Sequence, residues 1–163
     1  MNLTGDGWLD PSTVRVAYTL MNNETDAARR LRPISGPWSF FRRLRCTASG
    51  AICDDIDYYN RLHEQMHIVT SEANRNNDGI EGFDVRWDSN GVYKVWSTDV
   101  TPYISGGQSR TVSFEPLCGI LNQPKFIPLS YCPLSLELEV VTNPTDAIIS
   151  VASSDLTAAN TPE

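Results

Sequence analysis

The sequence predicts an all-β fold, a jelly-roll β-sandwich with one short helix insertion. Short stretches rich in strand-forming residues are separated by turns that contain Gly or Pro, and only one stretch has apolar residues at helical spacing. The clearest strand signal lies at 134–140, where four apolar side chains alternate with serine and glutamate. Such alternation gives a sheet one buried face and one solvated face. Many short strands with a single helix are typical of a sandwich or jelly roll.

Two strands and a hairpin are predicted in the first third of the chain. Residues 14–20 alternate between apolar and polar side chains, and residues 38–46 are rich in strand formers after a Gly-Pro turn at 36–37. The dipeptide Ser-Gly at 49–50 predicts a two-residue hairpin turn that returns the chain along 51–53. The predicted strand 38–46 has two faces, with Trp38, Phe40, Leu44 and Cys46 on one and Phe41, Arg43 and Arg45 on the other.

The hairpin turn would place Cys46 and Cys53 directly opposite each other. The other cysteines are Cys118 and Cys132, and none of the four has the Cys-x-x-Cys spacing of a zinc ribbon. The first residues show neither the basic region nor the apolar stretch of a signal peptide. We therefore expect reduced thiols, with a bridge between Cys46 and Cys53 as the alternative.

The one predicted helix begins near Asp54 or Asp55 and runs to about residue 68. Either aspartate can cap its N-terminus, and Asp57 would support the helix dipole. Its apolar side chains recur at helical spacing and should form the buried face: Ile56, Tyr59, Leu62, Met66 and Val69.

The second half of the chain reads as further strands and loops. Residues 71–82 are rich in Asn and Gly and predict a loop. Strands are predicted at 91–97, 111–114, 126–131 and 148–149, with a turn at 105–108 and a break at Pro133. We expect residues 1–152 to form one domain and residues 153–163 to form a polar tail or linker.

Composition excludes several classes of protein. The chain has 163 residues and a net charge of −7, with 40% hydrophobic and 20% charged residues. This excludes a disordered chain and disfavours a general nucleic-acid binder, which would be basic. No apolar run has the length of a membrane span.

Arginines are concentrated in one segment. Residues 29–45 contain six arginines and no acidic residue. Three readings are open: a face neutralised by the protein's own acids, an ion-pair face between subunits, or a phosphate-facing patch. The candidate interface residues are Arg42, Arg43 and Arg45.

A zinc-protease motif lies on the predicted helix. The sequence His63-Glu64-Gln65-Met66-His67 has two histidines four residues apart, which could ligate zinc while Glu64 acts as general base. A third ligand would have to be a carboxylate, since the motif contains both histidines of the chain. The acids that follow are not on an evident second helix: Glu72, Asp78, Glu81 and Asp84. We therefore expect no metal, no cofactor and no catalysis, with a zinc metallohydrolase as the alternative.

Four tryptophans offer a further alternative. Exposed indole rings can stack on sugar rings, which would suit a carbohydrate-binding β-sandwich, although such residues more often belong to a core. The tryptophans are Trp8, Trp38, Trp87 and Trp96.

Longer stretches resemble a known family. Residues 37–45, Gly50 and residues 54–63 resemble the major capsid proteins of Polinton-like, virophage-like and nucleocytoplasmic large double-stranded DNA viruses. Residues 119–129 and 133–139 resemble the same family. The matching stretches are spread over most of the chain between Trp8 and Val151, and they are not a catalytic signature.

The resemblance implies a double jelly-roll capsid subunit, of which this chain matches the N-terminal jelly roll. It also implies a non-enzymatic shell protein or endogenous viral remnant, located in the virion and assembled inside the host cell. Its partners would be itself, in a homotrimer of the full-length form, other capsid subunits and minor capsid proteins. Contact with nucleic acid stays open. The helix would be an insertion between strands and its His-Glu motif incidental.

Overall fold

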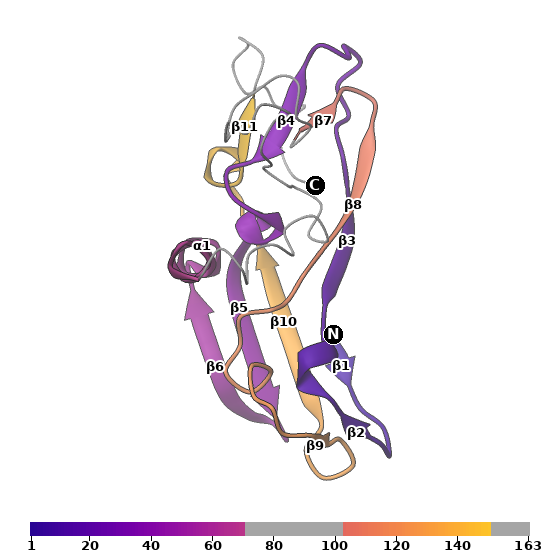
Figure 1. Cartoon of the computed structure of the whole chain (residues 1–163), viewed down its shortest axis with the longest axis vertical. Coiled ribbons are helices and arrows are strands. Elements are labelled where there is room, and N and C mark those ends of the chain that lie inside the picture. The colour runs from indigo at the N-terminus through magenta and orange to yellow at the C-terminus, as the bar shows by residue number, and fades with distance from the viewer. Residues whose placement is uncertain (71–102, 151–163) are drawn as a thin grey trace.

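The computed structural model describes residues 1–70 and 103–150, which form short antiparallel strands and one α-helix (Figure 1). The strands are β1 (Asn2–Leu3), β2 (Trp8–Leu9), β3 (Val16–Met21), β4 (Arg30–Pro33), β5 (Phe41–Ala48), β6 (Ala51–Asp57), β7 (Ile104–Ser105), β8 (Ser109–Phe114), β9 (Ile127–Pro128), β10 (Leu134–Val140) and β11 (Ile148–Ser150). The helix is α1 (Tyr59–Val69), and three 3₁₀ turns are η1 (Pro11–Thr13), η2 (Pro37–Phe40) and η3 (Pro144–Asp146). None of the helices in these ranges has the length and apolar character of a membrane span. The predicted strand 91–97, the loop 71–82 and the tail 153–163 lie outside the described residues.

The strands form four small sheets. The largest has the order β1-β10-β5-β6, and a three-stranded sheet has the order β11-β4-β7. Two further pairs are β2-β9 and β3-β8. In Figure 1 the four-stranded sheet lies in the lower half, the three-stranded sheet in the upper half, and the β3-β8 pair runs along one side. The all-β prediction is confirmed, whereas the jelly-roll arrangement stays a prediction.

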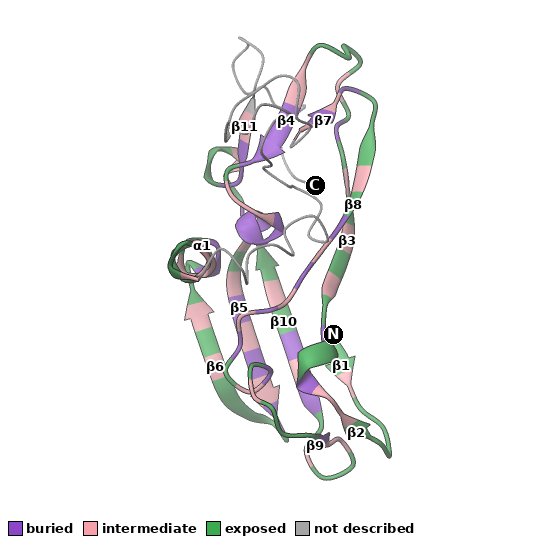
Figure 2. Ribbon diagram, viewed as in Figure 1, coloured by how far each residue is buried: buried purple, intermediate pink, exposed green. Residues whose placement is uncertain are grey.

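The strongest sequence signal, at 134–140, becomes the central strand β10. It pairs with β5 along its whole length, and its Leu134 and Leu136 are 2% and 3% exposed. Leu44 and Cys46 of β5 point to the same buried side. The inner face of the sheet therefore carries the main core, as the purple bands on β5 and β10 show (Figure 2).

The opposite wall of this core consists largely of irregular chain. Phe114 and Cys118 come from the end of β8 and the segment after it, and Leu121 and Ile127 follow. Asp54 of β6 fastens this segment, because its Oδ2 accepts the N–H of Gly119 at 2.8 Å and the thiol of Cys118 at 3.1 Å. In a complete sandwich a second regular sheet would cover this core. Here the Asp54 carboxylate links β6 to the irregular segment that covers it.

The hairpin turn at Ser49 and Gly50 is confirmed. Both residues have positive φ, 50° and 81°, as a two-residue hairpin turn of the primed type requires, and Ala48 pairs with Ala51. The predicted pairing of Cys46 with Cys53 is wrong, because a β-bulge follows the turn. Cys46 pairs with Asp54, which leaves Cys53 as an extra, exposed residue, and both thiols are free.

The helix begins later than predicted. Residues 51–57 continue as strand β6, and the residue at the helix N-terminus is Tyr58, not Asp54 or Asp55. Asp54 and Asp55 instead belong to β6, because pairing with β5 outweighs the preference of aspartate for helix starts. The predicted apolar face is also wrong in part, since Tyr59 is buried but Met66 and Val69 are 47% and 76% exposed.

Two predicted strands are shorter than expected. Residues 37–40 form the 3₁₀ turn η2, because Pro37 has no N–H for a ladder and its fixed φ suits the start of a helical turn. Of the predicted strand 126–131 only β9 forms, and the N–H groups of Tyr131 and Cys132 then turn back to the carbonyl of Pro128. The strands predicted at 14–20, 111–114 and 148–149 are confirmed as β3, β8 and β11, with the turn at 105–108 before β8.

Tyr18 of β3 lies where three apolar clusters meet. Its ring makes edge contacts with Phe40, at 6.1 Å between centroids, and with Phe41, at 5.4 Å. Phe40 belongs to a cluster that includes Leu31 of β4 and Ile148 of β11, and Phe41 packs against the main core. Tyr18 also packs against a third cluster, formed by Ile104 and Val112. Its hydroxyl donates to the carbonyl of Pro37, and burial raises its pKa.

Candidate functional site

The outer face of the four-stranded sheet carries two rows of charge. Arg45 of β5 lies between Glu137 of β10 and Asp55 of β6, and in the next row Arg43 lies between Glu139 and Asp57. Each row therefore runs acid, base, acid across three strands. Such cross-strand pairs of opposite charge stabilise a sheet, whereas like charges would oppose it. We call this set of six residues the charge rows.

Arg43 and Arg45 are bound to acids of their own chain. Arg43 forms two hydrogen bonds of 2.7 Å to the two carboxylate oxygens of Asp55. Arg45 contacts the same carboxylate at 3.3 Å and Glu137 at 3.8 Å. The hydrogen bond from Arg43 lowers the pKa of Asp55 and raises that of Arg43. Of the three readings of the arginine-rich segment, neutralisation by the protein's own acids fits these two residues best.

Arg42 departs from this pattern. Arg43 pairs with Glu139 and Phe41 pairs with Val140, so Arg42 is the extra residue of a second β-bulge. The bulge turns Phe41 toward the core, although the sequence predicted it on the face of Arg43 and Arg45. Arg42 is exposed, and its only ion pair within residues 1–70 and 103–150 is with Asp57 at 3.6 Å.

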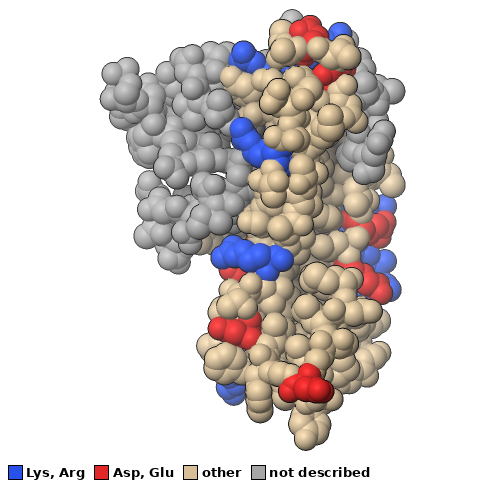
Figure 3. Space-filling view, turned by 90° about the vertical axis from the view of Figure 1, so that its right-hand side faces the viewer, with Lys and Arg blue, Asp and Glu red and all other residues tan. Residues whose placement is uncertain are grey.

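No continuous basic stripe crosses the described part of the face along β3 and β8. In Figure 3 this face is mostly uncharged, with separate basic and acidic groups. Arg15, just before β3, and Glu115, just after β8, form an ion pair of 3.7 Å. On this face the charges do not favour a phosphate-facing patch of the kind that binds nucleic acid.

The His-Glu motif of α1 packs around Trp38. The ring of His63 stacks on the indole, with 4.1 Å between centroids and planes 16° apart, and His67 lies 4.9 Å from it in a tilted arrangement. Glu64 accepts a hydrogen bond of 3.2 Å from the Trp38 Nε1–H. Trp38 itself is 1% exposed. The three motif side chains therefore form the face by which the helix attaches to η2, which the apolar spacing did not predict.

His63 is held as a neutral, buried ring. Its Nε2–H points to the carbonyl of Glu115 at 3.2 Å, while its buried Nδ1 has no hydrogen-bond partner. Burial lowers the pKa of His63 to about 4. The adjacent Tyr59 accepts the N–H of Leu117 at 2.8 Å, so the same helix face also fastens the segment after β8.

The described residues contain no group of three potential metal ligands. The carboxylates considered as a third ligand, Glu72, Asp78, Glu81 and Asp84, lie outside those residues. Within the described ranges, Glu64, the candidate general base, already accepts a hydrogen bond from the Trp38 indole. The Nδ1 of His63, which has no hydrogen-bond partner, is buried. This arrangement attaches the helix to η2.

Two buried thiols lie close to Asp54. Cys46 and Cys118 are each 1% exposed, and Cys118 donates to the Asp54 carboxylate. Its contacts with Cys46, burial and the Asp54 carboxylate together raise the pKa of Cys118. A protonated, enclosed thiol is a poor nucleophile, so Cys118 serves packing. The contact with Cys118 lowers the pKa of the Cys46 thiol, which is also enclosed.

One end of the molecule exposes aromatic rings. Trp8 of β2, Phe126 before β9 and Tyr131 after it are 72%, 63% and 85% exposed. These three residues, which we call the aromatic end, lie in or next to the β2-β9 pair, in which Trp8 lies opposite Pro128. The carbonyl of Tyr131 also accepts from the hydroxyl of Ser49 at the hairpin turn. Trp8 was among the tryptophans considered for sugar binding, but its position near β9 could not be predicted, because Phe126 and Tyr131 lie far from it in the chain. Trp87 and Trp96 lie outside the described residues.

No protein-family model matches the chain, and neither a curated protein nor a solved structure matches it at a significant level. Function is therefore inferred from the residues themselves.

Proposed function

We propose that the chain is a structural subunit of a viral capsid, a jelly-roll domain that assembles with copies of itself and with other capsid subunits in the virion and carries no catalysis. The proposal begins from the resemblance of residues 37–45, 54–63, 119–129 and 133–139 to major capsid proteins. The contacts of the described residues then favour assembly over chemistry, in three ways.

The aromatic end is the observation that carries the proposal. Three large rings, each at least 63% exposed, gather on one β-pair where water would normally disfavour them. Exposed apolar side chains that cluster mark surfaces that contact another molecule, and aromatic residues are enriched in such contacts. Trp8, Phe126 and Tyr131 would thus pack against another subunit.

The edge of the large sheet provides a second contact surface. Strand β6 has β5 as its one partner within the described residues, and its Ala51, Ile52 and Cys53 are exposed. An edge strand with free backbone groups can pair with another chain. The charge rows lie beside this edge and would restrict which orientation such a contact takes.

The residues that chemistry would need are used for packing. Glu64 accepts from Trp38, His63 is enclosed, and the Cys118 thiol donates to Asp54. A shell subunit requires rigid elements of this kind, with faces that repeat the same contact in a symmetric assembly.

Sedimentation velocity of the full chain, from low to high micromolar concentration, tests the proposal. We expect the wild-type chain to self-associate, and we expect the triple variant Trp8→Ser, Phe126→Ser, Tyr131→Ser to shift toward monomer. Electron microscopy of the associated fraction should show regular assemblies with repeated spacing.

The matched control replaces exposed apolar residues elsewhere, with Met66→Ser and Ile68→Ser on α1, which are 47% and 61% exposed. This control should associate as the wild type does. A wild-type chain that stays monomeric at high micromolar concentration in both low and high salt would contradict the proposal.

One observation favours a second candidate function, a carbohydrate-binding β-sandwich. Trp8 is 72% exposed, so its indole face is free to stack on a sugar ring. Saturable quenching or enhancement of Trp8 fluorescence by oligosaccharides, abolished by Trp8→Ala, would support this function in place of assembly.

A further inference from the structure

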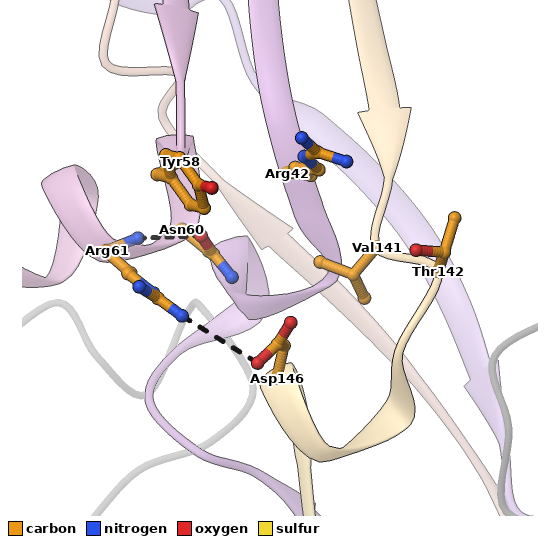
Figure 4. Close-up of a pocket in the computed structure, with 7 residues that line it drawn as sticks. All are labelled: Arg42, Tyr58, Asn60, Arg61, Val141, Thr142 and Asp146. Atoms are coloured by element: carbon orange, nitrogen blue, oxygen red, sulfur yellow. Dashed lines mark hydrogen bonds and ion pairs between the residues drawn. The ribbon is translucent and has the colours of Figure 1, made fainter.

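A small pocket lies where the regular part of the large sheet ends. It has a volume of about 180 Å³ and is lined by Arg42 of β5, Tyr58 and Asn60 at the start of α1, and Arg61 of the helix. Its other wall comes from the segment after β10, including Asp146 of η3 (Figure 4). Pockets for drug-sized ligands are larger, about 300–1,000 Å³, so this one suits a small group.

Two local irregularities of the backbone converge on this pocket. The β-bulge in β5 takes Arg42 out of the ladder and leaves its side chain exposed. Tyr58 has φ 52° and ψ 41°, the left-handed conformation, which is unfavourable for residues other than glycine. Such strain concentrates at functional sites, and bulges are frequent beside them. A glycine would satisfy the turn from β6 into α1, yet the chain has a tyrosine there.

Two guanidinium groups lie near the Tyr58 ring. The guanidinium carbon of Arg61 is 5.1 Å from the ring centroid, and that of Arg42 is 5.7 Å from it. Figure 4 shows Tyr58 and Arg61 at the start of the helix and Arg42 on the neighbouring strand. Each guanidinium group gains from the electron-rich ring, so Tyr58 helps to position both arginines at the pocket.

Both arginines keep free hydrogen-bonding capacity. Arg42 lies 3.6 Å from Asp57 and Arg61 lies 3.8 Å from Asp146, and their side chains are 44% and 65% exposed. Exposed ion pairs of this length contribute little to stability. Arg43, in contrast, binds Asp55 through two bonds of 2.7 Å. A ligand could therefore replace the partners of Arg42 and Arg61 at little expense, but not that of Arg43.

We propose that this pocket binds a small oxyanion, a phosphate or a carboxylate group, through Arg42 and Arg61, which both line it. Guanidinium groups present planar forks of N–H donors that match the oxygens of both anions. The ligand takes the place of Asp146 beside Arg61, and the Asn60 side chain borders the same space. Because Asp57 and Asp146 already offset the two positive charges, the affinity is modest and is limited by competition with Asp146. The inference does not depend on the capsid proposal.

The test is a titration of the full, isotope-labelled chain with inorganic phosphate and, separately, with acetate, both at constant ionic strength. The Nε–H resonances of Arg42 and Arg61 report binding directly in nuclear magnetic resonance spectra. We expect saturable shifts of both resonances with at least one anion. The anion that binds more tightly identifies the source as a phosphate or a carboxylate group.

Three variants make the test specific. Arg42→Gln and Arg61→Gln should each weaken binding by about 10-fold, since each removes one charge-assisted fork. Asp146→Asn should tighten binding, because it removes the internal competitor, and a gain of affinity cannot result from misfolding. Arg15→Gln is the matched control, an exposed arginine with an ion pair of 3.7 Å outside the pocket, and it should leave binding unchanged.

The proposal is overturned if neither anion gives saturable shifts at the two arginines. It is also overturned if Arg15→Gln weakens binding as much as Arg61→Gln, which would indicate general attraction to positive charge, or if Asp146→Asn leaves the affinity unchanged.

Discussion

Arginines at the two ends of strand β5 have different surroundings. Toward the hairpin turn, Arg43 and Arg45 lie in register between acids of the neighbouring strands, and Leu44 and Cys46 alternate with them into the core. At the start of the strand a bulge interrupts the ladder, and Arg42 faces a pocket beside the strained Tyr58.

This difference shows what regular pairing does to a charged side chain. Where the register is regular, each arginine has a carboxylate at a fixed distance and its charge is used to stabilise the sheet. Where the register slips by one residue, Arg42 has no residue opposite it on β10 and keeps only a longer contact of 3.6 Å with Asp57 of β6 among the described residues. The availability of an arginine in this protein thus follows from backbone register and not from residue type.

The largest loss of stability should come from a core residue in the regularly paired part of β5. Leu44→Ala removes a side chain that is 0% exposed at the centre of the main core, and we expect a loss of unfolding free energy of about 4 kcal/mol. Urea denaturation measures it. Met66→Ala, at a side chain exposed on α1, is the control and should change stability by less than about 1 kcal/mol. Equal losses would mean that the core is not where the structure places it.

The next effect concerns the irregular end, where His63 packs on Trp38. The folded chain holds the pKa of His63 at about 4, below the ordinary value of 6.5, so its contribution to stability is complete above pH 6.5. As the pH falls from 6.5 toward 4 the unfolded chain binds a proton that the folded chain does not, and stability should decline by up to about 3 kcal/mol.

Denaturation at a series of pH values measures this decline. His63→Gln should flatten the curve between pH 6.5 and 4, while His67→Gln controls for the loss of a ring beside Trp38. A curve for His63→Gln that keeps the full decline would contradict the assignment.

The smallest effect should come from the charge rows. Asp55→Asn removes the partner of both Arg43 and Arg45, and we expect a modest loss of stability that high salt abolishes. Since the pKa of Asp55 is lowered, this contribution is present above the ordinary pKa of an aspartate and disappears in acid. Thermal unfolding at low and high salt measures it, with Arg42→Gln as the comparison that should change little. A larger loss for Arg42→Gln would reverse the contrast between the two ends of β5.

Sequence periodicity predicted the parts of the fold that obey regular pairing. The strand at 134–140, the Ser49-Gly50 turn and the inward Leu44 and Cys46 follow from an alternation that one buried face imposes. The bulges at Arg42 and Cys53 could not be predicted, because they depend on which residue of a distant strand lies opposite.

The candidate site was less accessible to the same reasoning. The acids at 54–57 look like a helix start, and only the pairing with β5 turns them into strand residues. The apolar spacing of α1 pointed to Met66 and Val69, whereas the stacking of His63 and His67 on Trp38 determines which face is inward. A tyrosine at a left-handed position, such as Tyr58, has no sequence signal at all.

The position of Tyr18 among three apolar clusters has a consequence for how the protein unfolds. Clusters that share no side chain can melt separately, each with its own transition. Tyr18 contacts all three and also binds the carbonyl of Pro37, so disrupting one cluster withdraws packing from the other two. The described halves of the molecule are therefore coupled into one cooperative unit, although their sheets are separate.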